Sequence, residues 1–351
     1  MLSADGRTAG SSPYRPWLQR RIDAGQRSPI RAGLTIAAAT LVAFFGWHAL
    51  GWALGSGQPG DPYFWQQMFG PNVINAALIG YAPAAMAWSR RQALGELARL
   101  APLLPGGGAA LRERIERFPR AAMALAGAAF ALLIMPLIFF DPGLNAVWRS
   151  VGAFGRCWVI GVNVAVGWLM TRAVLEELRL ARIFSQAGEQ LVTLDLFDLA
   201  PLEPFARRGV ESVLVWSVGA SLLSLIFTGE GWASETLPFL VAAILIPAVN
   251  ALILPLIGVH RRIRTEKHAE LARIHACVRT DRDALLAGSA AAPEATARLP
   301  ALLALRSQVA DVREWPLDLP TVARLAGFLA IGLASWVGAA LVDVAIEAVL
   351  H

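Results

Sequence analysis

Long apolar stretches alternate with polar segments along the whole chain. Seven of these stretches are close to the ~20 residues that cross a bilayer core as a helix. The connections between them are alternately short and long. This pattern predicts an all-α fold, a polytopic membrane helix bundle with seven transmembrane helices. The predicted spans are 32–54, 71–89, 121–140, 152–172, 209–228, 237–259 and 321–345.

The arginines fall almost entirely in alternate connections. The other connections hold only Arg149 and, at the edge of a span, Arg156. Because basic loops stay in the cytoplasm, this asymmetry predicts a cytoplasmic N-terminus and, after seven spans, an external C-terminus. The arginine-rich segments are the tail 1–31, the loops 90–120 and 173–208, and the helical segment 260–320, which precedes the last span and C-terminus in 321–351.

Composition narrows the classes of function. The chain is 56% hydrophobic and 16% charged, whereas soluble domains average about 25% charged residues. Lys267 is the only lysine, and this preference for arginine indicates a bacterial coding bias and a bacterial inner (plasma) membrane location. The net charge of +5 is explained by arginines that orient loops and contact anionic headgroups. The expected partner is therefore the lipid bilayer and not nucleic acid. Cys157 and Cys277 are predicted in a span and in a cytoplasmic helix, so no disulfide is expected.

Helical periodicity continues past two of the spans into the cytoplasm. Thr171–Gln190 and His260–Leu286 both alternate apolar with charged positions at helical spacing. Amphipathic helices need a partner for their apolar side, so a cytoplasmic helical layer is predicted. Helices lying flat on the membrane are an alternative that suits loop 90–120 best. Other helices are predicted at Ala93–Leu103, Ala110–Phe118 and Leu299–Arg313, with a flexible linker at Ser289–Thr296.

The segment 192–205 alternates apolar residues with carboxylates and contains two prolines. It predicts an elbow at the cytoplasmic interface rather than a helix. The three carboxylates Asp195, Asp198 and Glu203 lie close in sequence to Arg207 and Arg208, so surface ion pairs are expected. The alternative is an ion-binding mouth.

Polar residues deep in a span are candidates for a functional site because they are costly there. Asn163 and Asn250 fall near the midpoints of their spans, at matching predicted depth, and could face one polar cavity. Pro247 precedes Asn250 by three residues and would free a carbonyl there, as in a broken helix that lines a pathway. The alternatives are interhelical hydrogen bonds by the asparagines and an ordinary packing kink at the proline.

The last predicted span carries Ser335 as a further pore or ligand candidate. Ala334 and Gly338 form a small-xxx-small pair on the same span, which predicts close packing against a neighbouring helix. That neighbour belongs either to the same subunit or to another copy in a homo-oligomer.

Two short segments carry a resemblance to known proteins. The sequences WPLDLPT, at Trp315–Thr321, and DLFDLAPLEPF, at Asp195–Phe205, resemble segments of an uncharacterised bacterial multispanning membrane protein family. The layout, though not the residues, resembles the insect chemoreceptor class of seven-helix ion channels. Those proteins also have a cytoplasmic N-terminus, a cytoplasmic layer built from span extensions, and a last span that lines the pore. This resemblance implies a channel.

Enzyme motifs are missing: the chain has no H-E-x-x-H, G-x-S-x-G or Walker A sequence. His260, His268 and His275 have no supporting ligand spacing, so neither a metal nor another cofactor is expected. The leading hypothesis is a channel or transporter-like protein for a small solute or ion. The alternatives are a non-enzymatic sensor or accessory subunit acting through cytoplasmic helices, and a lipid-modifying membrane enzyme.

Overall fold

The computed structural model describes residues 28–55, 68–117, 121, 124–129, 132, 153–192, 194–225, 237–288, 292–315, 323 and 327. Regular structure in this part of the chain is entirely helical, which confirms the all-α prediction. The long helices are α2 (Pro29–Ala53), α3 (Gly70–Leu100), α7 (Ala153–Glu189), α8 (Glu203–Ser224), α9 (Leu237–Leu286) and α10 (Ala292–Asp311). The short ones are η2 (Ala101–Leu103), η3 (Pro105–Gly108), α4 (Ala109–Glu116) and η4 (Ala200–Leu202).

Helix α2 has clear start and stop signals. Ser28 caps it by accepting a hydrogen bond from the Arg31 amide at 3.2 Å, and Pro29 occupies the first helical position. Gly55, with φ of 81°, follows the last turn and allows a conformation that other residues rarely adopt. Within the described residues, α2 and α7 are the two helices long and apolar enough to cross a membrane.

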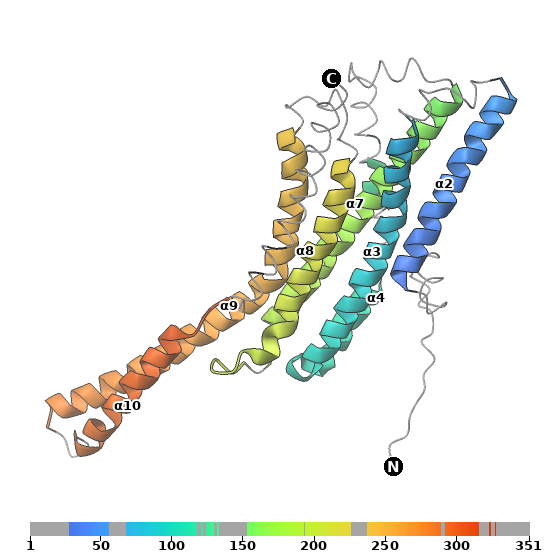
Figure 1. The fold of residues 1–351 in the computed structure, drawn as a ribbon. Helices are drawn as coiled ribbons and strands as arrows, with labels where there is room; N and C mark the ends of the chain where they lie inside the picture. The colour runs from blue at the N-terminus through green and yellow to red at the C-terminus, as the bar shows by residue number, and fades with distance from the viewer. Residues whose placement is uncertain are drawn as a thin grey trace, which may run out of the picture.

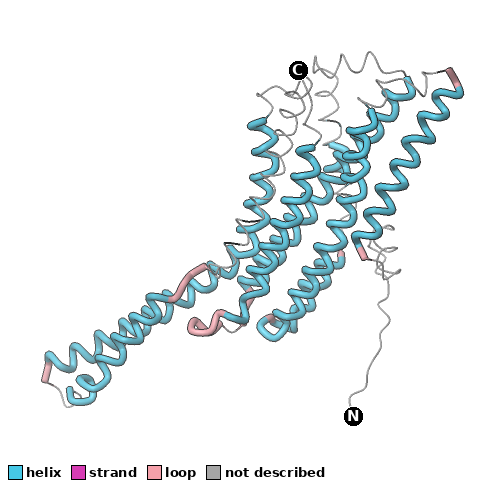
Figure 2. Tube along the Cα trace, viewed as in Figure 1, coloured by secondary structure: helices cyan, strands magenta, loops and turns pink. Residues whose placement is uncertain are grey.

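The helices α2, α3, α7, α8 and α9 lie side by side as a bundle (Figure 1, Figure 2). Glycines permit the closest contacts. A β-carbon on Gly80 of α3 would overlap the carbonyl of Gly33 on α2, and one on Gly258 of α9 would overlap the carbonyl of Ser185 on α7. The backbones approach closely at both contacts because glycine has no side chain to keep them apart.

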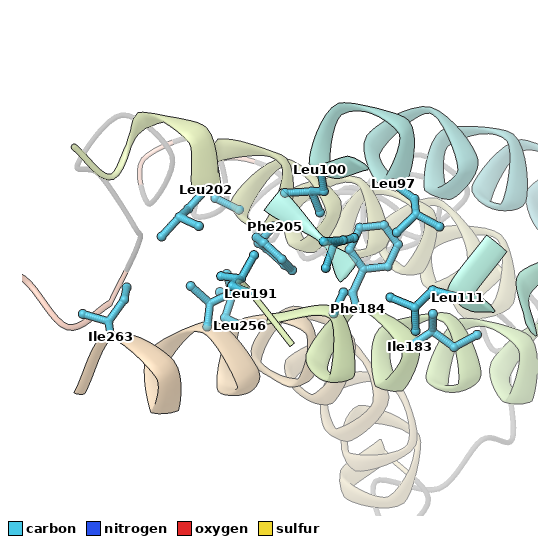
Figure 3. Close-up of a cluster of buried hydrophobic side chains, with 14 of the residues drawn as sticks. Leu97, Leu100, Leu111, Ile183, Phe184, Leu191, Leu202, Phe205, Leu256 and Ile263 are labelled. Atoms are coloured by element: carbon cyan, nitrogen blue, oxygen red, sulfur yellow. The ribbon is translucent and has the colours of Figure 1, made fainter. Parts of the chain in front are cut away.

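A hydrophobic core fills one end of the bundle, between α3, α4, α7, α8 and α9 (Figure 3). Phe184 and Phe205 form its centre as an edge-to-face pair with ring centroids 6.1 Å apart. Both rings are fully buried. The predicted extension Thr171–Gln190 therefore exists as the last turns of α7, and its apolar side is covered by this core.

The second half of α9 leaves the bundle and pairs with α10 (Figure 1). We call this pair, residues 260–311, the arm. The unbroken helix through His260–Leu286 confirms the predicted extension. The prediction for α10 was wrong at its start, since the helix begins at Ala292 and not at Leu299. Pro293 is tolerated in the first turn, so the expected linker is several residues shorter.

Candidate functional site: a buried charge network

Four charged side chains converge between α3, α7 and α8, next to the hydrophobic core. They are Arg90 on α3, adjacent Glu176 and Glu177 on α7, and Arg208 on α8. Their exposed fractions are between 0% and 4%, although isolated charges are almost never fully buried. We call these four residues, with Ser89, Arg179 and Ser212, the charge network.

Glu176 joins α7 to α3 through Arg90 and to α4 through Arg179. Arg90 places Nη2 at 2.5 Å from Oε1 of Glu176, and Arg179 donates from Nε to Oε2 at 2.9 Å. Arg179 also donates to the carbonyls of Arg114, Ile115 and Arg117 at 2.7–3.1 Å. These carbonyls lie at the C-terminal end of α4, where helix geometry leaves them unpaired. The Glu176 carboxylate therefore holds α3, α4 and α7 together.

Glu177 joins α7 to α8 and, through Ser89, to α3. Arg208 donates from Nη2 to Oε2 of Glu177 at 2.5 Å and to Oγ of Ser89 at 2.7 Å. Ser89 in turn donates to Oε1 of Glu177, and Ser212 donates to Oε2 at 3.3 Å. Within the described part of the chain, Nε and Nη1 of Arg208 have no hydrogen-bond partner. An oxygen of Glu211 lies 4.0 Å from Nη1.

The electrostatics of the network favour its charged form. Burial raises the pKa of Glu176, but Arg90 and Arg179 lower it by more, so the net result is a pKa below the usual carboxylate range. Taking such charges out of water is costly, and the cost is recovered only while every partner is present. The network is therefore sensitive to the relative positions of α3, α7 and α8.

The network lies just past the starting end of α2. Gly33 of α2 contacts Gly80 of α3, and Ser89 is nine residues further along α3, or about 13 Å. Pro29, where α2 begins, is four residues from Gly33, or about 6 Å. Since α2 and α3 run antiparallel (Figure 1), the buried charges are about 7 Å beyond the end of the apolar helix α2.

The structure separates the two asparagines that the sequence places at one depth. Helices α7 and α9 run in the same direction and cross where Ser185 meets Gly258. Asn163 is 22 residues before this crossing and Asn250 is eight before it, so about 21 Å separates them along the bundle. The amide of Asn163 donates to the carbonyl of Val159 on its own helix at 2.9 Å. These two residues do not share a cavity.

Of the two remaining pore candidates, the described residues include Pro247 but not Ser335. Helix α9 continues through Pro247 as one helix, so no broken helix forms there. Ser335, Ala334 and Gly338 lie outside the described residues. No group of three or more His, Cys, Asp or Glu side chains in the described ranges is placed to hold a metal ion.

The elbow before α8 is held by its own carboxylates. Asp195 accepts a hydrogen bond from the Phe197 amide at 2.9 Å, and Asp198 accepts one from the Ala200 amide at 3.1 Å. Both stabilise turns, as short polar side chains commonly do. Arg207 pairs instead with Glu203 at 2.6 Å, one helical turn away. The turns and the Glu203–Arg207 pair agree with the elbow, but among the described residues Asp195 and Asp198 form no ion pair with Arg207 or Arg208. The elbow carboxylates do not converge into an ion-binding mouth.

Sequence reasoning missed the charge network because its charged members lie in segments predicted to be arginine-rich loops. One signal was available. Glu177 precedes Leu180 and Phe184 by three and seven residues, which places it on the apolar side of its helix. A carboxylate on a buried helix face requires a buried cation.

Comparisons with protein-family models, curated proteins and solved structures find no match to this chain.

Proposed function

We propose that this chain is an integral protein of the bacterial inner membrane that couples its membrane-spanning helices to the cytoplasmic arm. It acts as a sensor or accessory subunit and has no enzymatic activity. The proposal is based on the continuity of α9 from the bundle into the arm. This single helix of 50 residues packs against α7 and α8 in its first half and against α10 in its second. A displacement of α9 in the bundle therefore moves the arm.

The proposed topology has seven spans, with the N-terminus inside and the C-terminus outside. Its support is the distribution of arginines together with two apolar helices of sufficient length. The charge network fits this topology. It lies past the cytoplasmic end of α2, at the depth where charged side chains meet water and headgroups instead of hydrocarbon.

The charge network suits a coupling role. It ties α7 to α3 and α8, while α9 crosses α7 at Gly188 and Gly258 with backbone in close approach. Packed interfaces of this kind shift between discrete arrangements and do not deform continuously. A stimulus that repositions α3 or α8 would change the contacts of the charge network. The resulting displacement of α7 would then move α9.

Hydrogen exchange in nanodiscs tests the coupling. Glu177→Gln removes the charge that Arg208 requires, whereas Glu113→Gln, in the exposed Glu113–Arg117 pair, is a matched control. The proposal predicts that Glu177→Gln lowers protection of the arm amides by about tenfold or more, since local opening free energies respond to lost packing, and that the control leaves them unchanged. A change confined to α3, α7 and α8 would contradict the proposed coupling.

A channel assembled from several copies is the second candidate. The observation in its favour is that extensions of α7 and α9 form a helical layer with α3 and α8, as in the chemoreceptor-like layout. Native mass spectrometry from nanodiscs and ion flux into proteoliposomes separate the two proposals. Coupling through the arm predicts flux equal to that of empty liposomes, whereas a closed ring of three to five copies with measurable flux supports a channel.

A further inference from the structure

One face of α9 in the arm carries six basic or histidine side chains. They recur at spacings of three, four and seven residues, which places them on the same side of the helix. We call this the basic face, and all its members are exposed. They are Arg261, Arg264, His268, His275, Arg279 and Arg282.

Of the carboxylates on the arm's part of α9, only Asp283 pairs with the basic face, at Arg282. Glu266 and Glu270 lie on the opposite side of α9, where they pair with Arg262 at 2.8 Å and Arg273 at 3.0 Å. Asp281 is buried and pairs with Arg298 of α10 at 2.9 Å.

Two arginines of the face are available to a partner. Within the described residues, Arg264 and Arg279 form no ion pair, whereas Arg261 pairs with Glu189 and Arg282 with Asp283. Leu286, 79% exposed, ends the same face eighteen residues after His268, which is five full helical turns. Clustered cations on a helix are attracted to anionic lipid headgroups, and an exposed leucine at the end of the row would add apolar contact with the membrane surface.

We infer that the basic face docks on the anionic phospholipid headgroups of the inner leaflet. This inference rests on the proposed membrane insertion of the chain. Arg261 comes two residues after the predicted span 237–259, so the face is tethered directly to that leaflet. From Arg261 to Arg282 the face is about 32 Å long. The arm slants away to one side of the bundle (Figure 1), and a slanted arm can present its length to the bilayer.

The natural cysteine on the arm makes a direct test possible. Cys277 is exposed and lies nine residues after His268, on the opposite side of α9. A fluorescent donor on Cys277, in a Cys157→Ser background, therefore leaves the basic face free. Energy transfer to acceptors on lipid headgroups would be measured in nanodiscs of phosphatidylcholine alone and of phosphatidylcholine with about 30% phosphatidylglycerol.

Docking predicts higher energy transfer in the anionic nanodiscs and its loss at high salt. Arg264→Gln with Arg279→Gln should lower the ratio of docked to free arm by roughly 25-fold, since each arginine near an anionic surface contributes a factor of about five. The control pair Arg262→Gln with Arg273→Gln removes the same charge from the opposite face and should keep the response. Arg264→Lys with Arg279→Lys should keep the response as well.

Two results would overturn the inference: energy transfer that does not depend on lipid charge, or equal losses in both glutamine pairs. Either would be distinct from a failure of the proposed function. A chain that does not incorporate into nanodiscs at all would refute membrane insertion, whereas an embedded chain with a lipid-insensitive arm refutes only the docking.

Discussion

Glu177 and Arg208 form an ion pair at 2.5 Å with almost no exposure to solvent. Removing one member of a buried pair leaves an uncompensated charge, and such losses are typically about 3–5 kcal/mol. We expect Glu177→Leu to lower the free energy of unfolding by this amount, measured by thermal unfolding in detergent. Glu113→Leu, in an exposed pair, should change it by about 1 kcal/mol or less.

The double variant Glu177→Leu with Arg208→Met provides the internal check. With both charges removed, apolar side chains fill the site and much of the lost stability should return. Additive losses in the double variant would show that the two side chains do not act as a pair.

The lowered pKa of Glu176 determines how the stability of the protein should change at acidic pH. Its pKa is lowered in the folded state, so the unfolded state binds more protons as the pH falls. The stabilisation is complete above the ordinary carboxylate pKa and is lost as the pH falls through the lowered folded value. Between about pH 5 and pH 3 the wild type should therefore lose stability more steeply than Glu176→Gln. Parallel unfolding curves for the two proteins would contradict this assignment.

At the scale of elements, the α7–α9 crossing depends on Gly258. A β-carbon there would overlap the carbonyl of Ser185, which is backbone and cannot move aside alone. Gly258→Ala should therefore destabilise the bundle by about 1–3 kcal/mol and increase hydrogen exchange in the arm. Gly95→Ala on α3 has open space around it and should leave stability unchanged or slightly raised. Equal stability of the two variants would mean that the crossing is looser than the structure shows.

Sequence patterns predict some of these elements but not the contacts between them. The extensions of α7 and α9 were predictable because their 3.6-residue apolar period extends well past the ends of the predicted spans. The pairing of Glu176 and Glu177 with Arg90 and Arg208 was not. It depends on the rotation of three helices about their own axes. Nothing in a single sequence distinguishes the arginines that pair with these glutamates from the many other arginines in the predicted loops.

The relative depths of residues on different helices could likewise not be predicted from the sequence. Asn163 and Asn250 were assigned one depth because each lies midway along its apolar stretch. The Ser185–Gly258 crossing shifts α9 relative to α7, so a midpoint in one helix does not correspond to a midpoint in the other. Such shifts are set by small residues at contacts, and no period in the sequence reports them.

At the scale of the whole molecule, the two ends of the bundle differ. The core and the network lie at the end from which the arm leaves, and α2 begins near that end (Figure 1). This polarity is what a protein inserted across a membrane in one orientation requires.

Chemical labelling of Cys157 and Cys277 shows whether the chain is inserted in the membrane with the arm in the cytoplasm. Both thiols are exposed, Cys157 near the start of α7 and Cys277 on the arm. A membrane-impermeant maleimide should label Cys277 in inverted inner-membrane vesicles and not in intact spheroplasts, with Cys277→Ser as the control for labelling at Cys157. Labelling of Cys277 in spheroplasts, or recovery of the chain in the soluble fraction, would contradict the account.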